Sequence, residues 1–586
     1  MQALLLLLPL LLSIIAMSFV RKEFVKYIAL IASVISLVLL IIVNNGSYFI
    51  TLLSLGGYTL QIATNIAALN LLLLSIVLII APLVIFYSFG YMNIRSEQRR
   101  FYIEIVAFEA AMLLFAMSYS FITMFIAWEF LSLTSYLLIG FWYNNEVANI
   151  AARKAITTVF IGDICILAAM AIMLAISGSL NFTTVFTSLQ NAPSAELLVA
   201  ILLGIAIFTK SAQFPFSEWL PDAMEGPTPV SAFLHSSTMV KAGVFALLIL
   251  SPIFIQTNLN TMIFYFALIT IILATLNALK EKHIKKVIAY STIQELGLMV
   301  LAISGGAVAA GVYFFFAQSF YKVLLFFSSG AVMEATEKTS LDETSGLKTN
   351  KLIYITTLFG VLSLAGFIPF DGFFASMGLS SSFSSNLLVY LALNIFGVLT
   401  SIYAFRWFFL NGKKSPAAVT VKYLSMPKSI VISMIISAVL TLVASLVFFY
   451  FGVFGFNSFQ TLSITSLNYF DVLIESILAV IGLLIAYVIY KKSLRIRSSY
   501  LIKLINNGIL TNEVYLYFVK AIYEFAEGFY IFEEGLSKFL DGVGYMFIDI
   551  GKEVRKVSVG NVNSYALILS VGIILLFVFV YMINVV

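Results

Sequence analysis

Charged residues stand inside long apolar runs of this 586-residue sequence, at positions where lipid would be expected. Glu129 is the single charged residue between Ser118 and Asn145. Similar interruptions are Glu104, Glu109, Asp163, Lys210, His235, Lys241, Glu295 and Lys322. A charge at the centre of a bilayer costs at least about 2.5–3.5 kcal/mol, so such residues are usually functional. Titratable groups of both signs on several spans are what proton transfer through a membrane requires. The alternative is a set of buried ion pairs that fix helix register.

The composition is that of an integral membrane protein. Hydrophobic residues make up 61% of the chain and charged residues 10%, with a mean hydropathy of +1.05, whereas a soluble domain carries about 25% charged residues. The apolar runs are long and continuous, which indicates helices rather than barrel strands. The single cysteine, Cys165, excludes an internal disulfide and a cysteine-ligated cluster, and the two histidines have no third metal ligand within reach. The net charge of +5 comes from bases in loops and does not indicate nucleic-acid binding.

These runs predict an all-α fold with about sixteen transmembrane helices. Loops after odd-numbered spans carry Lys and Arg, apart from an acidic loop after span 7, and loops after even-numbered spans carry none. The positive-inside rule then places both termini outside the plasma membrane and the charged loops in the cytoplasm. The predicted spans are residues 3–20, 26–44, 65–91, 101–118, 121–142, 153–178, 195–215, 228–256, 259–279, 284–304, 308–333, 350–378, 385–411, 427–455, 468–490 and 562–584.

Two of the predicted spans contain a helix-breaking proline. Pro215 in span 7 and Pro369 in span 12 each follow a Phe or Ile within an apolar run and precede a Phe, and they are 154 residues apart. Interrupted helices at matching positions of two halves are typical of ion-transport sites. The spacing predicts two five-helix repeats, spans 4–8 and 9–13. The predicted parts are residues 1–100 with helices 1–3, 101–256 and 257–411 with the repeats, and 412–497 with helices 14 and 15.

The C-terminal part carries a different pattern. Between Thr511 and Lys556, apolar residues recur every three or four positions with acids and bases between them. We expect a long amphipathic lateral helix within residues 498–561 on the cytoplasmic side, followed by a transmembrane anchor at 562–586. Its polar face is rich in acids, which favours contact with protein over contact with anionic lipid.

Several motifs resemble a known family. They are "WEFLSLTSYLLIGFWY" (128–143), "KSAQFPFSEWLPDAMEGPTPVSAFLHSSTMVKAGV" (210–244), "IKKVIAYSTIQELGLM" (284–299) and "YKVLLFFSSGAV" (321–332). They look like the antiporter-like membrane subunits of respiratory complex I, over about residues 65–410. The lateral helix and last span resemble the distal, L-type subunit of an NADH-quinone oxidoreductase.

The resemblance implies a proton pathway along the chain's buried charges. Glu129 and Lys210 match a glutamate–lysine pair on spans 5 and 7, and Asp163 matches a nearby acid on span 6. His235 and Lys322 match the histidine of span 8 and the central lysine of span 11, and Lys241 lies between them in sequence. The predicted path is Glu129, Asp163, Lys210, His235, Lys241, Glu295, Lys322 and Asp371.

The sequence departs from the family pattern at the expected outlet. Ser376 in "DGFFASMG" stands where span 12 usually has Lys or Glu, and Asp371 is the nearest acid. Gln318 stands where distal subunits often have histidine, and Glu295 where a neutral residue or histidine is common. The outlet could use Asp371, Glu295 or water.

The favoured function is that of a proton-translocating subunit driven by redox chemistry elsewhere. The resemblance places Fe–S clusters, flavin and quinone in partner subunits and no cofactor in this chain. The expected partners are sister antiporter-like subunits, the lipid bilayer and the translocated ion, which is H⁺ or Na⁺. One alternative is the large subunit of a multisubunit Na⁺/H⁺ antiporter or of a membrane-bound hydrogenase. A third is a structural anchor, which predicts that neutralising the buried charges preserves pumping.

Overall fold

The structure is a computed structural model that describes residues 2–55, 58–93, 97–414, 416–450 and 469–491, together with Lys520, Lys538 and Asp549. The chain divides into two units, Met1–Ile509 and Leu510–Val586. The predicted lateral helix and the final span fall outside the described residues, apart from those three isolated positions.

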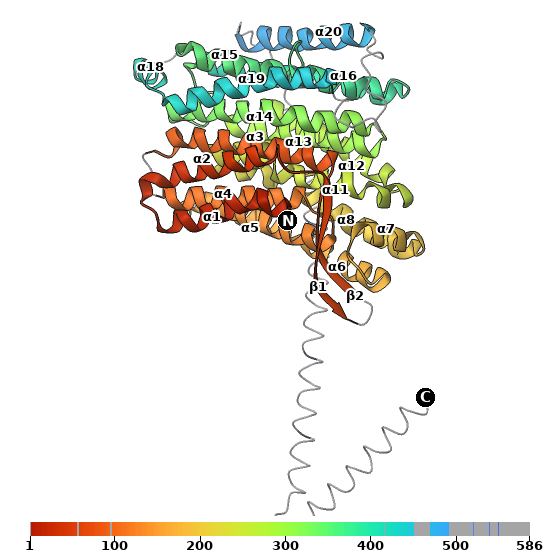
Figure 1. Ribbon diagram of the computed structural model, residues 1–586. Helices are drawn as coiled ribbons and strands as arrows, with labels where there is room; N and C mark the ends of the chain where they lie inside the picture. The colour runs from red at the N-terminus through yellow and green to blue at the C-terminus, as the bar shows by residue number, and fades with distance from the viewer. Residues whose placement is uncertain are drawn as a thin grey trace, which may run out of the picture. The chain divides into compact units, whose positions relative to one another are not determined.

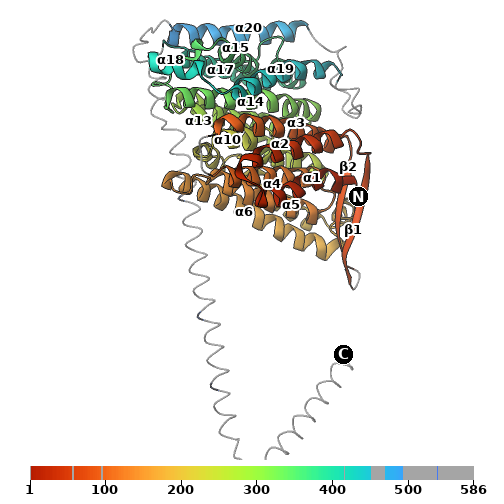
Figure 2. The same ribbon diagram turned by 60° about the vertical axis from the view of Figure 1, so that its left-hand side comes forward.

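The described part is mainly helical. Its helices lie roughly parallel to one another and are stacked from α6 at the bottom to α20 at the top of both ribbon views (Figures 1 and 2). The N-terminal elements are α1 (Gln2–Phe19), α2 (Lys22–Leu39), β1 (Gly46–Leu55), β2 (Tyr58–Ile66), α3 (Ala68–Tyr91), α4 (Gln98–Ala116), α5 (Phe121–Ile139), α6 (Glu146–Ser177), α7 (Phe182–Gln190), α8 (Pro193–Lys210) and α9 (Trp219–Asp222). The later helices are α10 (Thr228–Ser236), α11 (Met239–Gln256), α12 (Asn260–Lys280), α13 (Ile284–Ser304), α14 (Val308–Thr336), α15 (Lys351–Leu364), α16 (Asp371–Ser382), α17 (Leu387–Asn411), α18 (Ala417–Leu424), α19 (Lys428–Tyr450) and α20 (Tyr469–Ala486).

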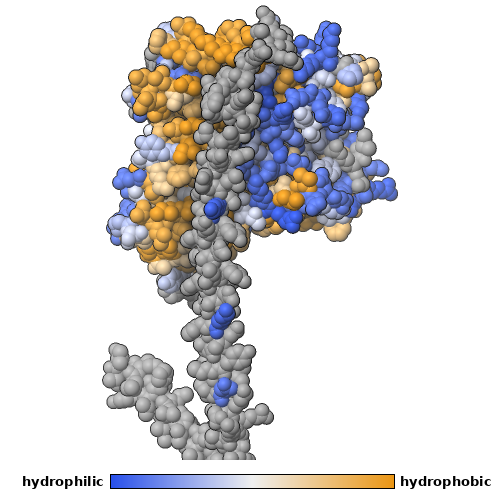
Figure 3. Space-filling model, turned by 180° about the vertical axis from the view of Figure 1, so that it is seen from behind, coloured by the Kyte–Doolittle hydropathy of each residue, from blue (hydrophilic) through white to orange (hydrophobic). Residues whose placement is uncertain are grey.

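The helices follow the hydropathy of the sequence. Each of the predicted spans up to residue 490 overlaps a helix, and 11 segments of the described chain are long and apolar enough to cross a membrane. Burial is greatest in the centre of the stack. In the 18-residue apolar stretch of each helix, 94% of the residues are buried in α13 and 89% in α14, compared with 33% in α6 and 17% in α20. The outer helices therefore present apolar side chains to lipid, while α13 and α14 can hold polar groups away from it. On the face seen in Figure 3, hydrophobic residues predominate in the left half of the view and hydrophilic residues in the right half.

A β-hairpin occupies residues that the sequence analysis assigned to a loop. Strands β1 and β2 pair antiparallel from Gly46–Ile66 to Leu55–Tyr58. The backbone N–H of Thr59 donates to Gly178 O at 2.8 Å, and that of Tyr119 donates to Ala63 O at 2.8 Å. The hairpin thus joins the loops that follow α4 and α6. Strand-forming residues around Gly-Gly are a signal for such a hairpin, which the uncharged composition concealed.

The two proline-containing breaks have the same local conformation. Helix α8 ends at Lys210 and α15 ends at Leu364, and in each case the second residue beyond is left-handed: Ala212 has φ 49° and Gly366 has φ 71°. The next backbone N–H bonds back to the helix, from Gln213 to Phe208 O and from Phe367 to Leu362 O, both at 2.9 Å. This is the Schellman ending of a helix, which satisfies carbonyls that the break leaves free.

A third break separates α10 from α11 and has no proline. Ser237 and Thr238 interrupt the apolar run there, and their hydroxyls donate to Phe233 O at 3.3 and 2.6 Å. Side-chain hydroxyls thereby satisfy a carbonyl that would otherwise be unpaired within the membrane. Span 8 was predicted as one continuous helix, and the structure corrects this. His235 and Lys241 consequently lie on either side of a break.

Candidate functional site

The buried charges lie on helices that contact one another. Contacts connect α5 with α6, α6 with α8, α8 with α11, α11 with α13, α13 with α14, α14 with α16, and α16 with α20. Glu129, Asp163, Glu295, Lys322 and Glu475 lie within their helices, whereas Lys210, Lys241 and Asp371 lie at helix ends next to a break. The charges therefore form a row across the stack rather than along any one helix.

Lys210 is the last residue of α8 and is fully buried. Its ammonium donates to Ser132 Oγ at 2.7 Å and to Trp128 O at 3.2 Å, and it lies 4.8 Å from the centre of the Trp128 ring. A cation at a helix C-terminus is also stabilised by the partial negative charge of the final carbonyls. The break after α8 therefore creates the environment that tolerates this lysine.

Asp163 completes the group around Lys210. Its carboxylate accepts a hydrogen bond from Trp128 Nε1 at 2.7 Å and a longer one from Ser132 Oγ at 3.4 Å. Ser132 therefore contacts both the lysine and the acid. A hydroxyl that can donate and accept is suited to passing a proton between its two neighbours.

Glu129 lies at the side of this group. It is half-buried and interacts electrostatically with Asp163 and Lys210, yet within the described residues it makes no ion pair within 4 Å of Lys210. The direct Glu129–Lys210 contact implied by the family resemblance is therefore not formed in this structure. Trp128 and Ser132, four residues apart, share the helix face that meets Lys210, and Glu129 lies about 100° around the helix from Trp128.

The acids of the segment between α8 and α10 are engaged with bases. Asp222 pairs with Lys154 at 2.7 Å and with Lys286 at 3.4 Å, and Glu225 lies 3.8 Å from Lys286. Glu218 accepts from Tyr290 at 3.4 Å, and burial raises its pKa. This acidic crossing between α8 and α10 gathers bases from α6 and α13.

His235 lies in the last turn of α10 and is fully buried. Neither ring nitrogen has a hydrogen-bond partner within the described residues. The rings of Trp219 and Phe326 are the neighbours, with centroids 6.3 and 6.5 Å away. An imidazole with both nitrogens available can accept a proton on one and release it from the other.

The carboxylate of Glu295 interacts electrostatically with both Lys241 and Lys322. The Lys241 ammonium donates to Phe315 O and Ser319 Oγ of α14, and the charges of Glu295 and Lys322 both act on it. Lys322 forms an ion pair of 2.9 Å with Glu295, and both side chains are almost completely buried. Tyr321 donates to the same carboxylate at 3.1 Å. Two ammonium groups and one carboxylate thus occupy the centre of the stack.

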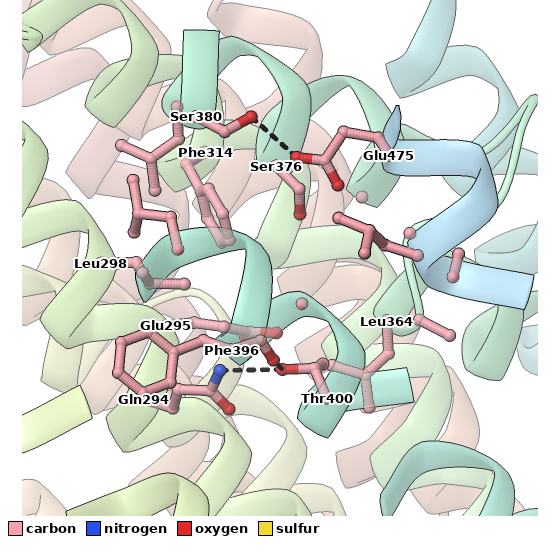
Figure 4. Close-up of a pocket in the computed structure, with 18 of the residues that line it drawn as sticks. Gln294, Glu295, Leu298, Phe314, Leu364, Ser376, Ser380, Phe396, Thr400 and Glu475 are labelled. Carbon is pink, nitrogen blue, oxygen red and sulfur yellow. Dashed lines mark hydrogen bonds between the residues drawn. The ribbon is translucent and has the colours of Figure 1, made fainter. Parts of the chain in front are cut away.

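Beyond Glu295 the structure contains a cavity between α13, α14, α16, α17 and α20 (Figure 4). Its polar lining includes Gln294, Glu295, Ser376, Ser380, Thr400 and Glu475. Asp371, the acid that the sequence analysis placed near the outlet, is the first residue of α16 and is held by Ser363 and by its neighbour's backbone N–H at 3.0 Å. It does not line this cavity.

Comparison with known proteins places the chain. The family model for the NADH:quinone oxidoreductase/Mrp antiporter transmembrane region matches residues 118–402, and the model for the N-terminus of complex I chain 5 matches residues 52–102. NADH-quinone oxidoreductase subunit L of Campylobacter jejuni is 34% identical over 78% of this chain and 78% of its own length. The chain belongs to the NADH:quinone oxidoreductase/Mrp antiporter family. Within it, the chain is an antiporter-like membrane subunit of the subunit L or chain 5 type.

Other members of the family agree with this assignment. NAD(P)H-quinone oxidoreductase chain 5 of Synechocystis is 36% identical over 61% of this chain and 55% of its own length. A chain of the Mrp complex from a Dietzia species aligns with a TM-score of 0.74 at 21% identity, covering 100% of this chain and 63% of that one. The membrane-bound sulfane sulfur reductase, an archaeal respiratory membrane complex, contributes a chain with a TM-score of 0.68 at 20% identity, covering 80% of this chain and 100% of that one. The structural matches establish a shared fold.

Sequence reasoning missed several polar residues of the row. Ser132, Tyr321 and Thr400 have common residue types and carry no signal that separates them from ordinary helix residues. Glu475 did carry a signal, because it is the sole charge between Asp471 and Lys491 in an apolar run, as Glu129 is in its own. Asp163 and Lys210 meet through Ser132, with Glu129 beside them, and Lys241, Glu295 and Lys322 interact at the centre of the stack. His235 is buried on α10, which contacts α11, α13 and α14.

Proposed function

We propose that this chain carries protons across a membrane through its row of buried charges, driven by redox chemistry in partner subunits. The observation that carries the proposal is the row itself: Asp163, Lys210, Lys241, Glu295 and Lys322 are nearly completely buried on helices that contact one another. Buried charges are costly in a membrane, and an inert anchor would gain stability without them.

The group around Lys210 provides a switch. Lys210 and Asp163 are joined through Ser132, and Glu129 adds a second negative charge nearby. A small movement of α5 relative to α8 alters these contacts, and with them the free energy of holding a proton on Lys210. An electrostatic change in a neighbouring subunit could act on Glu129, the half-buried member of the group.

The centre of the row provides the transfer step. A proton leaving Lys210 reaches His235, which can relay it to Lys241 across the break between α10 and α11. Lys241 and Lys322 repel each other and share Glu295, so a proton arriving at one favours release from the other. Each step is a proton transfer between nitrogen and oxygen atoms, with no bond to carbon made or broken.

The chain's wider organisation is part of the proposal. We infer two five-helix repeats, residues 101–256 and 257–411, and the matching backbone at Ala212 and Gly366, also 154 residues apart, supports this division. We further infer the charged loops on the cytoplasmic side of the plasma membrane and both termini outside. The lateral helix would contact sister subunits, and flavin, Fe–S clusters and quinone would reside in the partners.

The test is Lys210→Ala in the intact complex, reconstituted in vesicles. We expect the number of protons moved per electron to fall while the complex assembles normally. The matched control is Lys414→Ala, which removes an exposed lysine outside the row. Equal proton movement in the parent and both variants would refute the proposal, and a response to Na⁺ gradients instead of pH gradients would favour the antiporter alternative.

A further inference from the structure

Glu475 is a buried acid that none of the preceding steps uses. It lies on α20, is 8% exposed, and accepts a hydrogen bond from Ser380 of α16 at 2.7 Å. Among the described residues, no Lys, Arg or His nitrogen lies within 4 Å of its carboxylate. A carboxyl group buried without a base is unfavourable, so a structural role explains its presence poorly.

Glu475 lies on the face of α20 that packs closely against a neighbouring helix. Most of α20 is exposed, and its buried residues are Glu475, Ala479, Gly482 and Ala486. A Cβ on Gly482 would meet Ser401 at 2.5 Å, so α20 and α17 approach closely. Among the described residues, the acid therefore lies on the narrow face of α20 that packs against α16 and α17.

The cavity connects this acid with the centre of the row. Glu295 and Glu475 both line it, and Figure 4 shows them on different sides of the space, with Ser376 pointing into it. The cavity offers ≈ 40 Å³ to the centres of water-sized molecules, and one buried water needs about 10–15 Å³. A short chain of waters, together with Ser376 and Thr400, can therefore bridge the two carboxyl groups.

Position along the helices indicates the direction of transfer. Glu475 is six residues after the start of α20 at Tyr469, which is about 9 Å at 1.5 Å per residue. Ser380 is two residues before the end of α16 at Ser382. Ser376 also lines the cavity, at the position where the sequence analysis expected a Lys or Glu. Glu475 of α20 thus places an acid at the cavity, to which α16 contributes Ser376 and Ser380 but no charged residue.

We propose that Glu475 is the last proton-carrying group of the pathway. It receives a proton from Glu295 through the cavity and releases it near the C-terminal end of α16, at Ser382. The proton leaves one carboxyl oxygen, crosses by exchange along waters and hydroxyls, and protonates the Glu475 carboxylate, which then loses it to bulk water. This inference rests on the proposed function, and it replaces Asp371 as the outlet acid.

The test uses Glu475→Gln in the intact complex in vesicles, compared with Lys322→Met. The glutamine side chain would still accept the hydrogen bond of Ser380 through its amide oxygen, so assembly should be retained. We expect the number of protons moved per electron to fall to the same value in both variants. Asp471→Asn, one turn earlier on α20 and outside the cavity lining, is the matched control and should leave that number unchanged.

The outcomes separate the two proposals. A reduced ratio in Lys322→Met with a normal ratio in Glu475→Gln overturns the role of Glu475 alone, whereas normal ratios in both overturn the proposed function. An equal loss in Asp471→Asn also overturns the assignment. A second variant, Glu475→Gln with Ser376→Glu, returns an acid to the cavity from α16. Restored pumping supports the inference, and an assembled complex that does not pump contradicts it.

Discussion

The ion pair between Lys322 and Glu295 permits a prediction that separates stability from transport. At 2.9 Å, two unit charges attract by about 6 kcal/mol if the effective dielectric constant is about 20. Both side chains are almost entirely buried, so solvent does not screen this attraction. Part of it offsets the cost of moving the two charges out of water. Removing one partner leaves the other charge uncompensated, which costs about 3–5 kcal/mol.

The experiment is a double-mutant cycle of Glu295→Gln, Lys322→Met and their combination. Each single variant should lower the heat-denaturation midpoint of the purified complex clearly. The double variant should recover most of the loss, because no unpaired charge remains, and the coupling free energy should be at least about 2 kcal/mol. The signal is the tryptophan fluorescence of the complex during heating.

Transport should not follow stability in this cycle. The double variant lacks both titratable groups, so it should move as few protons per electron as either single variant. Additive effects on the denaturation midpoint would refute the view that the two groups form one buried pair. Normal pumping by a stable double variant would show that the pair is structural.

Two further predictions concern residues outside the charge row. Gly366→Ala should destabilise the protein by about 1 kcal/mol, because alanine is strained at a φ of 71°. No atom lies within 4 Å of a Cβ at Gly366, so the change in the denaturation midpoint reports backbone strain alone. At the start of α13, burial and the charges of Lys285 and Lys286 lower the pKa of His283 to about 3, and its Nδ1 accepts from the backbone N–H groups of both lysines. The pKa of His283 in the folded protein lies below the unfolded value of about 6.5. The stability gained by keeping this imidazole neutral is therefore complete above pH 6.5 and declines as the pH falls towards 3. His283→Asn should flatten the change in the denaturation midpoint between pH 7.5 and 5.5, and an unaltered pH profile would contradict the assignment.

The sequence predicted where the helices lie because hydropathy follows the membrane directly. It predicted less about how side chains meet. Which face of α5 turns towards Lys210 depends on the rotation of one helix against another, so the sequence could not show that Ser132, rather than Glu129, contacts it. The break between α10 and α11 was missed because serine and threonine, unlike proline, also occur within helices. The hairpin was missed because its strands are half-exposed and carry no alternating charge.

The outlet was the least predictable part of the site. The sequence left the outlet open among Asp371, Glu295 and water, because Ser376 stands where the family usually has Lys or Glu. Glu475 lines the cavity from α20. Helix α20 contacts α16, although more than 80 residues separate the two helices in the sequence. A lone acid in an apolar run is informative even when no motif surrounds it, and Glu475 could have been singled out on that ground.

The placement of the charges across the stack has an electrical consequence. Moving a proton across a membrane against a potential of 100 mV requires about 2.3 kcal/mol. In the proposed path, transfers among Lys210, Lys241, Glu295 and Lys322 pass between neighbouring helices rather than along one helix. They therefore add little movement along the membrane normal and little work against that voltage. The work is confined to the legs that lead in and out. Membrane potential should therefore slow the step through the cavity to Glu475 much more than the transfers along the row.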